Sequence, residues 1–224
     1  LANINRSNIK LDHYTEVNKH LRKEGRSTSG ELIIGLPGET KESFMKGAQH
    51  VIDSGVSRIV IYTLMMLHGT EFKDTAYRHK YGMKVKYRIV PLNLGEYDGV
   101  KVFDYEEVCV ENKDMSFEDY FYIRKFALIT ESIFNNGIFE AFFKYALAEG
   151  IKKSEFIFII LENIERAPTK IIKIFNEFAR ETKDELWNSD TEMVKHYKQE
   201  KNFQKLIKGE AGGNLIYKYK SLNI

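Results

Sequence analysis

Cysteine is almost absent from this chain of 224 residues, in which Cys109 is the single example. One thiol cannot form an internal disulfide, which is typical of proteins kept in a reducing compartment. It also cannot hold an iron–sulfur cluster, because such clusters need several cysteine thiolates. Cys109 lies in a segment with alternating apolar residues, so we interpret it as a small buried hydrophobic residue rather than a nucleophile.

Long apolar runs and a strong charge of either sign are also lacking. No run reaches the roughly 18 apolar residues of a membrane span, and the polar start has no apolar core of a signal peptide. The net charge is +2, and the charges are interspersed as on a solvated surface. We therefore expect a cytoplasmic protein without a membrane partner. The basic and aromatic segment 77–88 has the composition of a nucleic-acid-binding patch, but we favour an ordinary surface and expect no nucleic acid.

The most informative stretch that is present is ELIIGLPGET, residues 31–40. Its apolar run at 32–34 predicts a strand that is buried on both faces. Pro37 fixes its own φ and Gly38 is free to adopt a positive φ, as a type II turn requires. Thr40 is a suitable N-cap, so we expect a helix to begin directly after the turn.

The following residues complete a strand–helix–strand unit. A helix is predicted from Thr40 to about Ser54, and a strand rich in β-branched residues is predicted over 58–62. Short loops between such elements indicate parallel strands with a right-handed crossover. Ligands bind beyond the carboxyl ends of parallel strands. Residues 35–40 and 63–70 are therefore expected to face a ligand.

Later segments give weaker patterns. The pattern of residues 71–94 indicates no regular helix or strand. In residues 100–110 the side chains alternate between two faces, which predicts a strand. The acidic residues of that strand are Asp104, Glu106 and Glu107. They could act as a general-base pair or as metal ligands. We favour the alternative that they are solvated charges on the strand. Ser116, with Asp119 three residues later, predicts a helix start. Helices continue from there, and the last long one is predicted over 189–206.

Two of these segments resemble radical S-adenosylmethionine (radical SAM) enzymes. The loop GLPGET at 35–40 resembles the loop after their fifth strand, and LHGTE at 67–71 resembles the turn after their sixth. His68 stands where those enzymes usually have proline. Further similarity extends to about residue 190 and resembles the subgroup that carries a cobalamin (B12)-binding domain.

The resemblance implies an α/β fold in three parts. Residues 1–75 would be the C-terminal part of a partial (β/α) TIM-type barrel, containing strands 5 and 6. Residues 76–115 would be a connecting segment with one β-strand, and residues 116–224 a mainly α-helical C-terminal region. The missing first strands would lie upstream of Leu1. The chain is thus expected to be the C-terminal half of a longer protein, with the N-terminal half as its partner.

The activity implied by the resemblance is reductive cleavage of SAM by a [4Fe–4S] cluster. The product is a 5′-deoxyadenosyl radical that abstracts hydrogen from a small-molecule substrate. In the B12 subgroup, cobalamin takes part in methyl transfer or rearrangement. The cluster of this family is held by a C-x3-C-x2-C motif, which this sequence lacks. We expect the cluster ligands to lie outside this chain, and the chain to be inactive by itself.

The resemblance also implies a set of SAM-binding residues. Arg6 would pair with the SAM carboxylate, because a guanidinium suits bidentate contact. Glu39 would orient the loop or reach a polar group of the ligand. Each of these residues has a structural alternative, as core, helix-start or surface residue. The residues implied to lie at the adenine are Ile33, Ile34, Gly35, Thr63, Leu64 and Met65.

Two other functions remain open at this stage. The first is a (β/α)-barrel enzyme whose loop at Gly35–Thr40 binds phosphate at a helix N-terminus. That loop has neither the G-x-x-x-x-G-K-[ST] nor the G-x-G-x-x-G spacing. The second is a non-catalytic binding module, which the shortage of cysteine favours.

Overall fold

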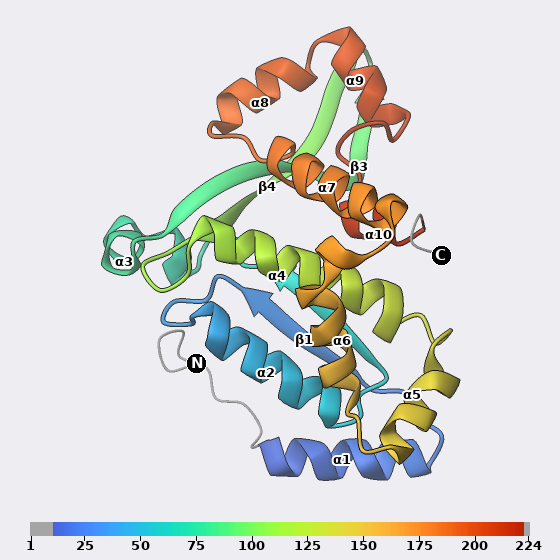
Figure 1. Ribbon diagram of the computed structural model, residues 1–224. Helices are drawn as coiled ribbons and strands as arrows, with labels where there is room; N and C mark the ends of the chain where they lie inside the picture. The colour runs from blue at the N-terminus through green and yellow to red at the C-terminus, as the bar shows by residue number, and fades with distance from the viewer. Residues whose placement is uncertain (1–10, 222–224) are drawn as a thin grey trace.

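The computed structural model describes residues 11–221, with side chains from His13 onward. Its N-terminal part is a strand–helix–strand unit flanked by a further helix (Figure 1). The two strands are parallel, with Ser29 opposite Arg58 and Ile34 opposite Thr63, which confirms the predicted crossover unit. Its elements are α1 (Leu11–Lys23), β1 (Ser29–Ile34), α2 (Lys41–Asp53) and β2 (Arg58–Thr63).

Helix α2 begins where the sequence predicts. The Thr40 hydroxyl accepts a hydrogen bond from the Ser43 amide at 3.2 Å, and the Ser43 hydroxyl accepts one from the Thr40 amide at 3.0 Å. This reciprocal cap satisfies two donors that a helix N-terminus would otherwise leave free. The apolar stripe of the helix, which contains Phe44, Ala48 and Ile52, is buried against the sheet.

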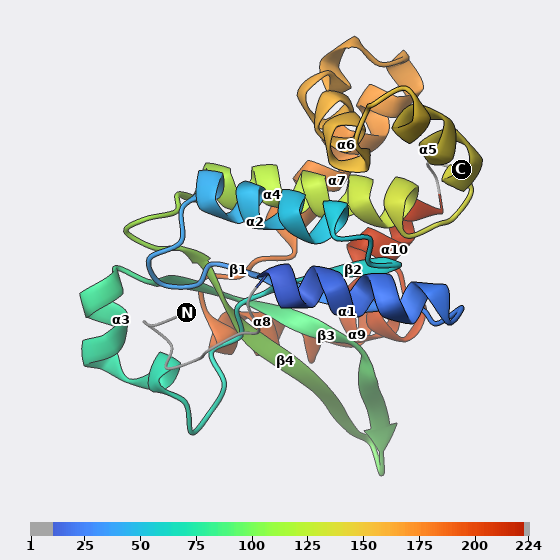
Figure 2. The same ribbon diagram turned by 90° about the horizontal axis from the view of Figure 1, so that it is seen from below.

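The two faces of the parallel pair differ. Helices α2 and α4 (Phe117–Ile129) lie side by side over one face (Figures 1 and 2), where Ile34 and Ile59 are buried in the main core. Side chains alternate between faces along a strand, so Ile33 and Tyr62 lie on the opposite face. Ile33 is half-buried there, and Tyr62 is 48% exposed.

Residues 76–115 contain a two-stranded antiparallel hairpin instead of the one strand expected. Its strands are β3 (Lys84–Tyr97) and β4 (Val100–Glu111). The sequence pattern of β3 is broken because Pro91 and Leu92, which has φ +68°, lie at an irregularity in the strand register. A short 3-10 turn (Glu71–Lys73) and α3 (Thr75–Tyr81) precede the hairpin.

The hairpin also bonds the segment that follows β2, through an isolated bridge between Met65 and Val108. The Cys109 amide donates to the Leu64 carbonyl at 2.9 Å, and the Met66 amide donates to the Glu107 carbonyl at 2.8 Å. Strand β4 therefore runs antiparallel to the segment that follows β2, in the position that β1 vacates when it turns away at Gly35.

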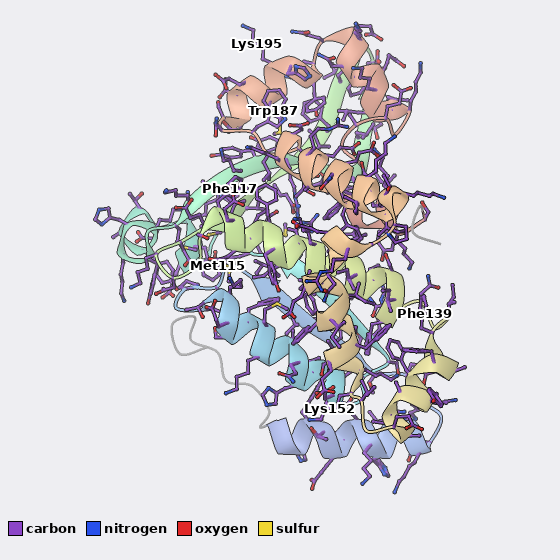
Figure 3. The ribbon with its side chains drawn as sticks, in the orientation of Figure 1. Met115, Phe117, Phe139, Lys152, Trp187 and Lys195 are labelled. Carbon is purple, nitrogen blue, oxygen red and sulfur yellow. The ribbon has the colours of Figure 1, made fainter. Side chains whose placement is uncertain are left out.

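The C-terminal region is helical, and its first helix has the predicted start. Ser116 and Asp119 form a capping box, next to Met115 and Phe117 (Figure 3). A π-helical segment, η3 (Thr130–Phe134), continues α4. The other helices are α5 (Glu140–Ala148), α6 (Lys153–Glu162), α7 (Thr169–Asp184), α8 (Asp190–Tyr197), α9 (Glu200–Ile207) and α10 (Leu215–Lys220), with a 3-10 turn at Ile164–Arg166.

The single long helix predicted over 189–206 is wrong, because the chain breaks it into α8 and α9. Met193 of α8 and Phe203 of α9 are both fully buried in one cluster against the hairpin. In a continuous helix, residues ten positions apart would point about 80° away from each other. The break lets both side chains face the same surface.

The described residues form two two-stranded sheets and no closed barrel. A TIM-type barrel therefore stays a proposal that requires further strands. Among residues 11–221, no helix is both long enough and apolar enough to cross a membrane.

Candidate functional site

The two segments expected to face a ligand meet at the carboxyl ends of β1 and β2. Ile34 is paired with Thr63, and the Leu64 amide donates to the Ile34 carbonyl at 2.9 Å. The structure thus brings six of the eight residues assigned from the resemblance to adjacent positions. They are Ile33, Ile34, Gly35, Thr63, Leu64 and Met65. Arg6 lies outside the described residues.

Asn112, directly after β4, holds the loop that follows β1. Its Nδ2 donates to the Gly35 carbonyl at 3.1 Å, while its Oδ1 accepts from the Asp114 and Met115 amides at 2.9 and 3.0 Å. Gly35 has φ +94°, and a Cβ there would lie 3.2 Å from the Cys109 carbonyl oxygen. Glycine is required because both its backbone conformation and its close approach exclude a side chain.

Asp114 holds the second glycine of the loop. The Gly38 amide donates to Asp114 Oδ2 at 3.1 Å, and Gly38 has φ +80°. Sequence reasoning identified neither Asn112 nor Asp114. Both follow an alternating strand and precede a helix start, where polar residues are expected for turn formation alone.

The side chains of the assigned residues point in different directions. Ile34 is fully buried behind the sheet, so its side chain cannot reach a ligand on the other face. Ile33 packs instead against a small cluster that contains Leu64, Met66 and Cys109. Met65 is 38% exposed. The site is therefore an apolar wall with backbone groups at its rim.

Glu39 is the ionisable residue of this loop whose titration is most altered. Removal of water around its carboxyl group raises the pKa of Glu39 to about 7. Its amide donates to the Leu36 carbonyl at 3.2 Å, which closes the turn. A carboxyl group with this pKa exchanges its proton near neutral pH, whereas an ordinary glutamate is ionised there.

Of the three acidic candidates in β4, Asp104 is exposed, whereas Glu106 and Glu107 are engaged in ion pairs. Glu107 is buried and accepts two hydrogen bonds from the Arg78 guanidinium, at 2.8 and 3.0 Å, and one from Lys73. Burial opposes ionisation, but these hydrogen bonds outweigh it and hold the pKa of Glu107 below its usual value. Glu106 pairs with Arg88. These contacts favour a structural role over general-base or metal chemistry.

The residues described here do not fit an iron–sulfur cluster. Cys109 is buried, and its thiol donates to the Glu111 carbonyl at 3.3 Å. Burial raises the pKa of Cys109 to about 11, so the thiolate needed for iron binding is disfavoured. Within residues 11–221, no group of three or more His, Cys, Asp or Glu side chains is arranged to hold a metal ion.

A cavity of about 560 Å³ lies beside the outer edge of β2. Thr63 and Met65 line it, so it adjoins the site from the side opposite β1. Its volume is within the range of small-molecule sites.

Comparison with known proteins gives one informative match. No protein-family model matches the chain. Over 85 residues, 38% of the chain, it is 32% identical to the cobalamin-dependent radical SAM methyltransferase TokK of Streptomyces tokunonensis. Part of the chain is similar to a radical SAM enzyme. The match covers 12% of the length of TokK, so the chain spans only a small part of that protein.

Proposed function

We propose that this chain is the C-terminal portion of a cobalamin-associated radical SAM enzyme and supplies one wall of its SAM site. The observation that carries the proposal is the junction of the two loops at the carboxyl ends of β1 and β2. There, an apolar wall with backbone groups at its rim suits a flat adenine ring. The similarity to TokK supports the same general family.

In this proposal, SAM contacts this chain, whereas the ligands of the iron–sulfur cluster belong to another part of the protein. Ile33 provides an apolar surface for the adenine, and the backbone of 63–65 provides its polar contacts. The [4Fe–4S] cluster is held by cysteines outside this chain, because the one thiol present is buried and protonated. Cobalamin is proposed from the name of the relative and from the sequence resemblance. Methyl transfer to a small molecule, in a cytoplasmic enzyme, is the corresponding reaction class.

The first test is the DNA sequence upstream of the Leu1 codon. We expect an open reading frame that continues into a C-x3-C-x2-C motif, preceded by a cobalamin-type domain. A stop codon directly upstream, with a start at Leu1, would overturn the proposal and favour a binding module.

The second test measures SAM binding by the protein that this reading frame encodes. We expect Ile33→Gln to weaken SAM binding about tenfold, because a buried amide replaces apolar surface at the ring. Glu31→Gln is the matched control, since Glu31 lies on the same face of β1 but is exposed and two residues further from the loop. Equal SAM affinities in the two variants would contradict the assignment.

The phosphate-loop alternative is less well supported. The Gly38 amide already donates to the Asp114 carboxylate, and the Thr40 amide donates to the Ser43 hydroxyl. A phosphate would have to displace both acceptors, and Asp114 would repel it. Thermal stabilisation of the chain by phosphate but not by SAM would favour this alternative; stabilisation by neither would favour a binding module.

A further inference from the structure

The cavity beside β2 is lined by backbone and side-chain polar groups that lack partners within the described residues. It is enclosed by β2, by the middle of the hairpin, by α4 and η3, and by the segment at α10. Glu185 at the end of α7 also lines it, so five separate parts of the sequence surround one space of about 560 Å³.

One wall of the cavity is an unpaired strand edge. The Arg58 and Leu64 amides donate toward the β1 side, to the Thr28 and Ile34 carbonyls. Because backbone groups alternate along a strand, the amides and carbonyls of odd-numbered residues point to the outer edge. At Ile59 the side chain of Asn135 takes the place of a neighbouring strand and bonds both groups, at 2.9 and 2.8 Å.

Beyond Ile59 this edge has no strand partner among the described residues. The next outward-facing residues are Ile61 and Thr63, and both line the cavity. Their backbone groups are suited to hydrogen bonding with an amide of a bound molecule, as in strand addition.

Two buried polar side chains in the lining have unused hydrogen-bonding atoms. Thr63 is 4% exposed and Arg124 is 6% exposed, and neither Thr63 Oγ1 nor Arg124 Nε has a partner within the described structure. Buried polar atoms are normally satisfied, and each unsatisfied one is costly. Because both residues also line the cavity, we infer that a bound molecule is the partner of these two atoms.

The charges around the cavity leave one cation in excess. Three arginines and three glutamates line it, and Lys220 adds a seventh charge by pairing with Glu131 at 2.7 Å. Arg124 has the weakest pairing, since it lies 4.0 Å from a Glu185 oxygen that is 3.3 Å from Arg88. The lining residues concerned are Arg58, Arg88, Arg124, Glu106, Glu131 and Glu185.

We propose that this cavity binds a small molecule that carries both an amide and a carboxylate, of the N-acylated amino acid class. Its amide bonds to the edge of β2 at Ile61. Its carboxylate supplies the missing partners of Arg124 and Thr63 and balances the excess positive charge. This binding does not depend on SAM, so it can be tested independently of the function proposed above.

The probe is N-acetyl-L-alanine, added to the ¹⁵N-labelled chain at constant ionic strength. We expect saturable shifts of the Ile61 and Thr63 amide signals at millimolar concentration. The matched control is the neutral N-acetyl-L-alanine methylamide, which should bind at least tenfold more weakly. Absent shifts, or equal affinity for acid and methylamide, would overturn the proposal.

Two variants test the residues. Thr63→Val keeps the side-chain shape and Arg124→Lys keeps the charge, and each should weaken binding of N-acetyl-L-alanine about tenfold. Arg180→Lys, on the exposed surface of α7, should leave it unchanged. Unchanged affinity in Thr63→Val, the near-isosteric variant, contradicts the assignment even if Arg124→Lys fails to fold. Displacement of the probe by SAM would show a SAM site instead and would also overturn the proposal.

Discussion

Asn112 determines the shape of the loop after β1. It is 5% exposed, and its side chain makes four hydrogen bonds that join this loop to the turn before α4. Because a residue outside the loop fixes its backbone, the GLPGET motif alone does not define the conformation.

We predict that Asn112→Ala lowers the free energy of unfolding by about 3 kcal/mol, because buried backbone groups lose their partners. Urea unfolding measures this. Asn163→Ala is the control, since Asn163 donates one exposed hydrogen bond to the Ile159 carbonyl, and its loss should be under about 1 kcal/mol. Similar values for both variants would show that Asn112 does not hold the loop.

Glu39 gives a prediction about pH. The pKa of an ordinary glutamate carboxyl group is 4.5, whereas the pKa of Glu39 in the folded chain is about 7. Between these values the folded chain binds more protons than the unfolded chain, so the contribution of Glu39 to stability decreases as pH rises from about 4.5 to 7.

Glu39→Gln removes the ionisable group and with it the loss of stability at high pH. At pH 8 we expect the variant to be more stable by on the order of 1 kcal/mol, or roughly 3 °C in Tm, after allowance for partial exposure. At pH 4 the carboxyl group is largely protonated in both the folded and the unfolded chain, and the two melting temperatures should agree. A Tm difference that does not change with pH would show that the Glu39 pKa is not raised.

At the scale of elements, one buried ion cluster connects α3 to the hairpin. Arg78 of α3 bonds both oxygens of Glu107 and also the Phe72 carbonyl, at 2.6 Å. The hairpin in turn bonds the segment after β2, so the position of α3 is linked to the candidate site.

We predict that Arg78→Met lowers the free energy of unfolding by about 3 kcal/mol, because Glu107 keeps only Lys73 as a close cation. The pKa of Glu107 should rise in this variant, which NMR titration measures. Arg166→Met, in a surface 3-10 turn, is the control. A stable variant with an unchanged Glu107 pKa would contradict the role of this cluster.

The hairpin also shows how an element escapes sequence analysis. Val85, Tyr87 and Ile89 alternate with Lys84, Lys86 and Arg88, which is the signal of a strand. We interpreted the basic and aromatic segment 77–88 as an ordinary surface and did not predict a strand there. The tertiary partners decide the outcome: the Tyr87 amide and carbonyl bond Trp187, one hundred residues later, at 2.9 and 2.8 Å.

At the scale of the whole molecule, substitutions on the two faces of the parallel strand pair should differ in their effect on stability. Ile59 is 2% exposed under the helices, whereas Tyr62 is 48% exposed on the other face. Ile59→Ala should therefore cost about 3 kcal/mol, and Tyr62→Ala less than about 1 kcal/mol.

Chemical denaturation of both variants at several protein concentrations is the measurement. If Tyr62→Ala costs as much as Ile59→Ala, the open face is covered in solution. A cost that grows with protein concentration would then identify the cover as a second copy of this chain.

The sequence by itself determined the parallel crossover unit and the starts of α2 and α4. These features depend on local information: apolar spacing, the turn residues Pro37 and Gly38, and cap residues close to the helices that they begin. The same information located the two loops that meet at the candidate site. Their meeting follows from parallel topology, which two strands and a helix already fix.

Only the tertiary structure decided which residues hold those loops and where the cavity lies. Asn112 and Asp114 contact the first loop from more than seventy residues away. The cavity combines β2, the hairpin, α4 and α10. Such arrangements depend on packing between distant segments, where burial, charge pairing and chain direction act together, and no local pattern in the sequence encodes them.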